Sequence, residues 1–482
     1  MDRIHHILTN TRTGRLSLWL ACLALLAGCT VGPDFSPPRT DVPKAWAGPG
    51  AMPATQPAGG AQALGRWWKA FNDPLLASLV ERAIESNLDL RIAQARIRQA
   101  RASRGVAASG LGPSVSASGA YNRGQSGSGS PVTSHYQAGF DAGWEIDIFG
   151  GVRRGVEAAD AQVQAAVEDR RNVQVTLAAE TARLYVQLRS LQQRLAIARR
   201  NLELQQHSAE LTRQRFEGGF VSGLDVANAQ AQVATTSSQV PLLESSARQT
   251  LYAIELLLDR TPGSLAQELA APADIPYAPP AVPLGVPADL LRRRPDIRSA
   301  EAGIHAATAN IGVAVADLFP RATINASLGW QADSLSSLLN PASRFWSFGP
   351  AVTWNAFQSG RVLSNIEVQK ALEEQSILAY RQTVLTAIQE VENALVASVK
   401  EQEHRKALTD AVAANRRAVE LAGQLYAQGN TDFLNVLSAQ QGLLNSEDAL
   451  AQSTAAISTD LIALYKALGG GWEETVPPGG QK

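Results

Sequence analysis

The chain has 482 residues, of which 43 are lysine or arginine and 44 are aspartate or glutamate. This near balance lacks the basic excess that nucleic-acid-binding proteins need, so we expect no nucleic-acid partner. A globular chain of this length would hold several domains, but the pattern described below favours an elongated molecule instead.

The first 28 residues have the pattern of a bacterial signal peptide, because three arginines precede an apolar run at 16–26 that is too short to span a membrane. The run ends in Leu-Ala-Gly-Cys, which resembles the lipobox of bacterial lipoproteins. Cleavage at a lipobox would leave Cys29 as an acylated N-terminus. An ordinary signal peptide with a chance cysteine is the alternative. Thr30 replaces the aspartate that in many bacteria marks retention at the inner membrane, so the resemblance implies the outer membrane.

The expected mature chain begins with a lipid-anchored, extended segment at 29–70. Removing residues 1–28 takes away three arginines and one aspartate, which leaves 40 basic against 43 acidic residues. Cys22 would be discarded and Cys29 acylated, so no disulfide can form. The covalent lipid on Cys29 is the one non-protein group that we expect, and no cofactor is predicted.

The rest of the chain is a tandem duplication. The segment "RFEGGFVSGLDVANAQAQV" from Arg215 aligns with "LYAQGNTDFLNVLSAQQGL" from Leu425, and upstream segments align in the same way. We therefore expect two structural copies, at 71–260 and 295–468. A linker at 261–294 joins them, and its prolines exclude a continuous helix.

Each copy is expected to contain long helices around a strand pair. In the first copy a helix of about 33 residues starts at Leu75, a long helix covers 152–216 and a return helix covers 224–259. In the second copy the long and return helices cover 361–426 and 433–468, before a C-terminal tail at 469–482. The first long helix carries a heptad repeat of apolar residues, at Leu177, Leu184 and Leu191. This repeat predicts a coiled coil, which would extend roughly 97 Å at 1.5 Å per residue.

Between the helices the hydrophobic period changes from 3.6 to 2, within regions at about 113–148 and 320–357. Each region is expected to form two strands joined by a surface loop. Such strands, with tryptophan near their ends, match a transmembrane barrel whose outside meets lipid. A soluble sheet with one buried face gives the same alternation and is the alternative. Four strands cannot close a barrel, and open edges are not tolerated in lipid, so we expect subunits to share one.

The sequence resembles the TolC-like outer membrane factors, in their lipoprotein branch that serves multidrug efflux. The resemblance rests on "CTVGPDFSPP" from Cys29, the segment from Trp67, "LRRRPDIRSAEA" from Leu291 and both glycine-turn segments. It implies a mainly α fold with a small β part, in which four strands per chain close as a trimeric 12-strand β-barrel on a 12-helix periplasmic α-barrel. It also implies a homotrimer whose partners are a periplasmic adaptor (membrane fusion) protein, an inner-membrane pump of the resistance-nodulation-division class, and outer membrane lipid.

The resemblance further implies that the two glycine turns, at about 217–230 and 427–440, are periplasmic tips that gate the channel and contact the adaptor. The tip residues that it singles out are Gly219, Leu224, Asp225, Gly429, Leu434, Asn435, Ser438 and Gln441. Some members hold aspartates where this chain has Asn435 and Ser438, so this chain departs from the pattern of an acidic gate ring, and Leu434 offers apolar closure instead. Asp225 has two interpretations, a gating residue or a helix-start cap.

Three acidic residues, Asp141, Glu145 and Asp147, alternate on the polar side of a predicted strand. In a trimer they would put nine carboxylates in the pore, where they either favour cations or merely solvate a wet wall. The histidines are scattered, which predicts no metal site.

We therefore expect a passive exit duct for small molecules or drugs, without catalysis. The alternatives are a type I secretion duct, a periplasmic coiled-coil lipoprotein that acts as a tether, and a lipid-anchored enzyme, for which no catalytic constellation is present.

Overall fold

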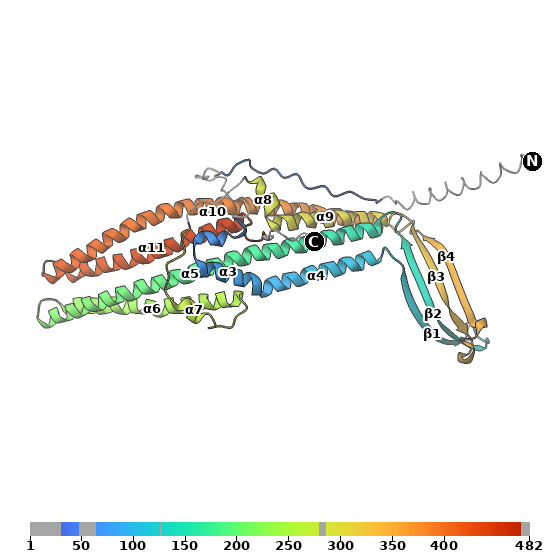
Figure 1. The fold of residues 1–482 in the computed structure, drawn as a ribbon, viewed down its shortest axis with the longest axis horizontal. Coiled ribbons are helices and arrows are strands. Elements are labelled where there is room, and N and C mark those ends of the chain that lie inside the picture. The colour runs from blue at the N-terminus through green and yellow to red at the C-terminus, as the bar shows by residue number, and fades with distance from the viewer. Residues whose placement is uncertain (1–29, 48–63, 126, 279–285, 474–482) are drawn as a thin grey trace, which may run out of the picture. The chain divides into compact units, whose positions relative to one another are not determined.

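The computed structural model describes residues 30–47, 64–125, 127–278 and 286–473 (Figure 1). The predicted signal peptide and Cys29 lie outside the described residues. The chain divides into two compact units. We call the unit whose described residues lie within 30–40, 95–167 and 299–382 the strand unit, and the unit whose described residues lie within 41–94, 168–298 and 383–473 the helical unit. Each unit takes segments from both sequence copies, so a copy is not a compact unit by itself.

The duplication is visible in three pairs of helices that have equal length. The pairs are α5 (Gly151–Glu217) and α10 (Arg361–Ala427) with 67 residues each, α6 (Gly223–Leu257) and α11 (Phe433–Ala467) with 35, and α4 (Leu88–Ser109) and α9 (Pro295–Ala316) with 22. The ends of the long and return helices differ from the predicted ones by at most two residues. At 1.5 Å per residue, α5 and α10 each extend roughly 100 Å.

The prediction of one 33-residue helix from Leu75 is wrong, because two helices, α3 (Pro74–Ser86) and α4, occupy this region. Asn87 separates them with a ψ of 134°. Its side-chain oxygen accepts a hydrogen bond from the Asp89 N–H (2.8 Å), and its amide nitrogen donates to the Leu257 carbonyl (3.0 Å). Asn87 therefore caps α4 and also ties it to the end of α6.

Four strands form one antiparallel sheet in the order β1-β2-β3-β4 (Figure 1). They are β1 (Ser114–Gln125), β2 (Val132–Ile146), β3 (Arg321–Ala332) and β4 (Arg344–Thr353). β2 and β4 end a few residues before the alternating sequence pattern does. The pairing of β2 with β3 joins the two sequence copies, and β1 and β4 form the two edges.

The linker at 261–294 includes two short helices, α7 (Ala266–Ala270) and α8 (Ala288–Arg293); residues 279–285 lie outside the described part. Arg294 follows α8 and is only 8% exposed. Its guanidinium donates to Asp296 (2.6 and 3.0 Å), Glu390 (2.6 Å) and the Ala467 carbonyl (2.9 Å). The conspicuous Arg-Pro-Asp sequence thus forms a buried ionic link between three helices of the helical unit.

The core of the helical unit also includes segments before α3 and after α11, whose sequences show no regular pattern. Trp67, in the 3-10 helix η1 (Trp67–Phe71), is 1% exposed and stacks on Tyr465 at 5.2 Å. Trp472 lies under the guanidinium groups of Arg171 (4.6 Å) and Arg298 (5.5 Å). Both arginines also bind the buried carboxylate of Glu168, at 2.6 and 2.7 Å. The first residues of the predicted tail are therefore packed into the core.

Candidate functional site

The strand register divides the sheet into an apolar and a polar face. Phe140 lies opposite Ala117 and Leu328, and Leu328 lies opposite Trp346. Opposite residues of neighbouring strands point to the same side of a sheet. We call the following set the apolar face: Val115, Ala117, Tyr121, Tyr136, Ala138, Phe140, Ala142, Trp144, Ile146, Ile324, Ala326, Leu328, Trp330, Trp346, Phe348, Pro350 and Val352. The predicted alternation is thereby confirmed on all four strands.

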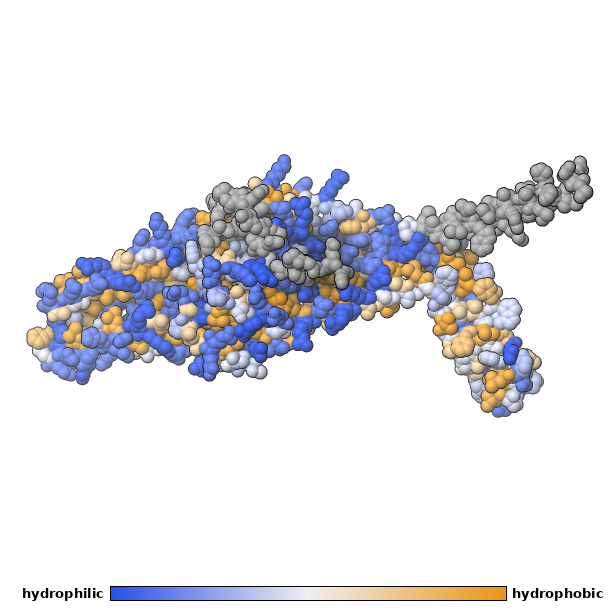
Figure 2. Space-filling view, in the orientation of Figure 1, coloured by the Kyte–Doolittle hydropathy of each residue, from blue (hydrophilic) through white to orange (hydrophobic). Residues whose placement is uncertain are grey.

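Large side chains of the apolar face are exposed to solvent in the single chain. Trp346 is 77% exposed, Val352 71% and Phe348 69%. In Figure 2 the visible side of the sheet is mostly apolar or pale in colour, and apolar and hydrophilic residues are mixed at its loop end. A continuous exposed apolar surface of this kind indicates contact with lipid or with another apolar surface.

Two tryptophans occupy equivalent places at the helix end of the sheet. The Trp144 indole N–H donates to the Leu111 carbonyl (3.0 Å), and the Trp354 indole N–H donates to the Leu318 carbonyl (3.1 Å). Leu111 lies between α4 and β1, and Leu318 lies between α9 and β3, so the second copy repeats the arrangement of the first. Indoles with an apolar ring and a satisfied N–H are typical of membrane–water interfaces.

The three acidic residues predicted to face the pore occupy different environments. Asp141 lies on the polar face and accepts hydrogen bonds from the hydroxyls of Ser327 (2.9 Å) and Ser118 (3.3 Å). Glu145 lies on the same face, at the end of β2. Asp147 lies beyond β2, and its carboxylate accepts the N–H groups of Val152 (3.1 Å) and Arg153 (2.8 Å) at the start of α5. The structure therefore gives Asp147 the contacts of a helix cap.

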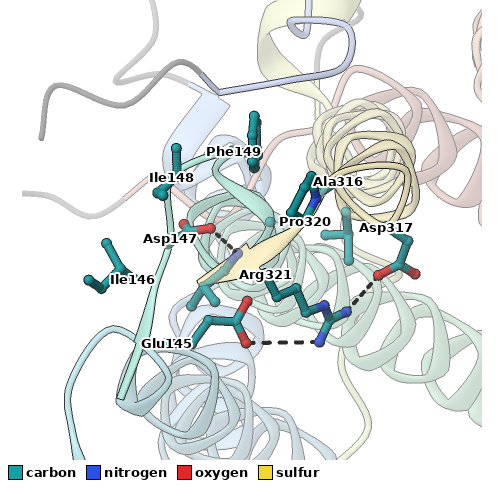
Figure 3. A pocket seen from close by; sticks show the side chains of 12 residues that line it. Glu145, Ile146, Asp147, Ile148, Phe149, Ala316, Asp317, Pro320 and Arg321 are labelled. Atoms are coloured by element: carbon teal, nitrogen blue, oxygen red, sulfur yellow. Dashed lines mark hydrogen bonds and ion pairs between the residues drawn. The ribbon is translucent and has the colours of Figure 1, made fainter. Parts of the chain in front are cut away.

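A cavity of about 180 Å³ lies where β2 leads into α5 and α9 leads into β3 (Figure 3). Arg321 donates to Asp317 at 2.6 Å and lies 3.8 Å from Glu145. Phe149 stacks on Phe319 with ring centroids 4.5 Å apart. Charge pairing and ring stacking together stabilise the bend between strands and helices. In the described part of the chain, no group of three or more His, Cys, Asp or Glu residues is placed to hold a metal ion.

The two predicted tips have the same backbone turn. Gly219 and Gly429 adopt φ values of +74° and +81°, which favour glycine. After each glycine the next N–H bonds back into the helix, from Phe220 to the Arg215 carbonyl (2.9 Å) and from Asn430 to the Leu425 carbonyl (2.8 Å). This pattern is a Schellman turn that ends α5 and α10.

Other predicted tip residues make local contacts or point to solvent. Asp225 and Ser222 form a reciprocal capping box at the start of α6, so the cap interpretation of Asp225 has direct structural support. Asn435 donates to the Thr431 hydroxyl at 2.7 Å, and Ser438 is exposed. Leu224 is 68% exposed and Leu434 62%.

The first hairpin, α5 with α6, packs against the second, α10 with α11, at the tips. An apolar cluster joins them, made of Ala229, Tyr426, Phe433 and Val436. The Arg215 guanidinium lies 4.6 Å from the centre of the Tyr426 ring and also donates to the Tyr426 carbonyl. The Tyr426 hydroxyl donates to Thr212 at 3.2 Å. Sequence reasoning missed Arg215 and Thr212, because no local pattern marks contacts between residues more than 200 positions apart.

Polar side chains continue this contact away from the tips. They include the pairs Gln232 with Gln441 (2.5 Å), Gln440 with Ser208 (2.8 Å) and Arg194 with Asp448 (2.6 Å). Gln441 is thus the predicted tip residue that links the two hairpins. We use the name hairpin link for the contacts between the two hairpins that pair Arg194 with Asp448, Ser208 with Gln440, Gln232 with Gln441, and both Arg215 and Thr212 with Tyr426.

Farther along α11, a groove of about 460 Å³ contains Asp460, with Arg183 and Arg194 of α5 among its lining residues. Burial raises the pKa of Asp460 to about 6, and the negative charge of Glu401 on α10 adds to the effect. Glu401 itself accepts hydrogen bonds from the Ser453 hydroxyl and from His404. Among the residues that the structure describes, no helix combines the length and the apolar composition needed to cross a membrane.

The sequence model of the outer membrane efflux protein family matches residues 79–260 and 286–470. The chain therefore belongs to this family of outer membrane efflux channels. Nodulation protein T of Rhizobium leguminosarum bv. trifolii is 32% identical over 463 residues, which cover 94% of this chain and 97% of that protein. The pyoverdine export outer membrane protein OpmQ of Pseudomonas aeruginosa is 33% identical over 477 residues, which cover 95% and 97%.

Solved structures show the same fold. The outer-membrane channel OprN superimposes with a TM-score of 0.83 at 39% identity, covering 92% of this chain and 100% of that chain. The MtrE outer membrane channel of Neisseria gonorrhoeae, in its open state, gives a TM-score of 0.78 at 28% identity and covers 92% and 99%. The predicted family and the mainly helical fold with a small antiparallel sheet are confirmed, and the protein functions in efflux at the outer membrane.

Proposed function

We propose that three copies of this chain form the exit duct of a tripartite efflux system. The strands of three subunits would close one 12-strand barrel in the outer membrane, with the apolar face toward lipid. The helices would continue the duct into the periplasm as a 12-helix barrel. The observation that carries the proposal is a four-stranded sheet whose apolar face is exposed and whose edge strands, β1 and β4, have no further partner among the described residues. Such edges need pairing in lipid.

The tips at 217–230 and 427–440 would close the periplasmic end and receive an adaptor protein, which connects the duct to an inner-membrane pump of the resistance-nodulation-division class. The duct itself would catalyse nothing, since the pump supplies the energy. A covalent lipid on Cys29 would add a second attachment to the membrane. Relatives are named for export of pyoverdine and toluene, which favours small organic molecules as cargo.

The test compares the native chain with Cys29→Ala after extraction into detergent. We expect a trimer on gels without boiling and a monomer after boiling, for both proteins, and extraction that requires detergent in both cases. Labelled palmitate should be incorporated by the native chain alone, and the trimer should conduct ions in a planar bilayer. A monomer or dimer released into buffer by Cys29→Ala would contradict the duct and favour a tethered coiled coil.

A further inference from the structure

The apolar face carries charge at one end only. Arg123 of β1 is two residues from Tyr121 and lies opposite Ser134, so it points to the same side as the apolar face. Arg344 of β4 lies opposite Trp330, which places it on that side as well. Among the described strand residues, every other Asp, Glu, Lys or Arg lies on the polar face, at Asp141, Glu145 and Arg321.

Both arginines lie at the loop end of the sheet, away from the helices. Arg123 is two residues from the end of β1, and Arg344 is the first residue of β4. Both side chains are exposed, and neither forms an ion pair within the described part of the chain. A charge on a lipid-facing surface is unfavourable at the midplane and tolerated near the interface. Their position is therefore the interfacial one.

The two arginines lie on the two edge strands. This step rests on the proposed function, because in a shared barrel β4 of one subunit pairs with β1 of the next. Each of the three junctions then combines Arg344 of one subunit with Arg123 of its neighbour on the lipid-facing side. Trp346 and Phe348 follow Arg344 on β4 and extend the apolar face below it.

We propose that each subunit junction binds one molecule of the phosphorylated glycolipid that forms the outer leaflet of the outer membrane. Guanidinium groups bind phosphate through paired, charge-assisted hydrogen bonds, while the exposed aromatic side chains contact the acyl chains. The combination of cationic groups at the rim and an apolar surface below them fits a molecule that has a phosphorylated head and several acyl chains. The lipid would bridge two subunits and stabilise the trimer.

The test measures binding of diphosphorylated lipid A and of lipid A without phosphates to the detergent-solubilised trimer by native mass spectrometry. We expect wild type to bind the diphosphorylated form at least tenfold more tightly, with three molecules per trimer. The double variant Arg123→Gln with Arg344→Gln should lose most of that preference, while Arg123→Lys with Arg344→Lys should keep part of it. The matched control, Arg98→Gln with Arg101→Gln, removes two exposed arginines of α4 in the same unit and should bind like wild type.

Equal binding of both lipids by wild type would overturn the proposal, and this comparison does not depend on whether a variant folds. An unchanged preference in the double glutamine variant would also overturn it, as would equal competition by phosphatidylglycerol or inorganic phosphate. Conductance and the unboiled trimer band are measured on the same samples. A conducting trimer without lipid preference contradicts this inference alone, whereas the absence of a trimer contradicts the proposed function.

Discussion

Arg294 connects residues that are distant in the sequence, since it binds Asp296, Glu390 and the Ala467 carbonyl. Desolvation opposes the charge of a buried guanidinium, but here the hydrogen bonds to two carboxylates outweigh it and raise the pKa of Arg294. The sequence motif that contains this residue supported the family resemblance, but its physical role became clear only from its partners.

Replacing Arg294 with methionine should destabilise the fold by about 1–3 kcal/mol, because it leaves the buried Ala467 carbonyl without its hydrogen bond and removes the counter-charge of two partly exposed carboxylates. The measurement is the urea-unfolding midpoint of the Cys29→Ala protein in detergent. Arg292→Met is the matched control, since the Arg292 side chain is 79% exposed and pairs with Asp289 at the surface. That control should change stability by less than about 1 kcal/mol. Equal effects of the two substitutions would contradict the assigned role.

Asp460 should make stability depend on pH. Its pKa is about 6 in the folded chain, against an ordinary value of 3.8 for an aspartate in water, so the folded state binds the proton more tightly than the unfolded state does. Stability should therefore fall as pH rises from about 4 to about 6 and stay constant above that range. Asp460→Asn should raise stability at pH 7.5 by about 1–2 kcal/mol and leave it unchanged near pH 4.

Urea midpoints at pH 4 and 7.5 measure this effect. Asp448→Asn serves as a control of opposite sign, because Asp448 pairs with Arg194 at 2.6 Å and its loss should destabilise the protein at pH 7.5. A stability at pH 7.5 that Asp460→Asn leaves unchanged or lowers would contradict the prediction.

Among the elements, the helices and strands were largely predictable because their patterns are local. The heptad repeat and the absence of interrupting signals marked α5, and the alternating residues marked β2 through β4. The break at Asn87 was not predictable, since this residue caps α4 while its amide binds the Leu257 carbonyl from another helix. The end of β2 was also missed, because Asp147 continues the alternation in sequence while its carboxylate binds the start of α5.

We expect the hairpin link to keep the helix tips of the proposed channel closed. Arg215→Ala removes a cation–π contact and a hydrogen bond to the Tyr426 carbonyl. A cation–π contact contributes about 1 kcal/mol, so the open fraction should rise by about fivefold. Single-channel recording in a planar bilayer measures this fraction.

Arg213→Ala is the control, because Arg213 is exposed and pairs only with Glu210 and Glu217 of its own helix among the described residues. It should leave the open fraction unchanged. A channel whose open fraction is the same with Arg215→Ala as with Arg213→Ala would show that the hairpin link does not hold the tips closed.

In the proposed trimer, assembly depends on the two edge strands, β1 and β4, whose outer sides pair with no other strand among the described residues. In a Cys29→Ala background, cysteines introduced on β1 at Ser118 and on β4 at Ser347, Gly349 or Ala351 should cross-link neighbouring subunits. At least one of the three pairs should give covalent trimers, because β-sheet neighbours bring paired positions within reach of a disulfide. The measurement is a denaturing gel without reductant.

The control pair, Ala142→Cys with Ala326→Cys, occupies register partners within one chain. It should give only intramolecular cross-links and run as a monomer. Monomers alone from all three edge pairs would contradict a barrel that neighbouring subunits share through β1 and β4.

The duplication, the lengths of the long helices and the two faces of the sheet follow from the order of the residues alone, because periodicity depends on residues a few positions apart. Other contacts depend on how distant segments pack against one another. Arg215 contacts Tyr426 211 positions away, and Arg294 contacts Ala467 173 positions away. The carboxylate of Asp147 caps α5, and Arg123 and Arg344 lie on opposite edges of the sheet, on the side of the apolar face. Such relations follow from how whole helices and strands pack, and no local pattern encodes them.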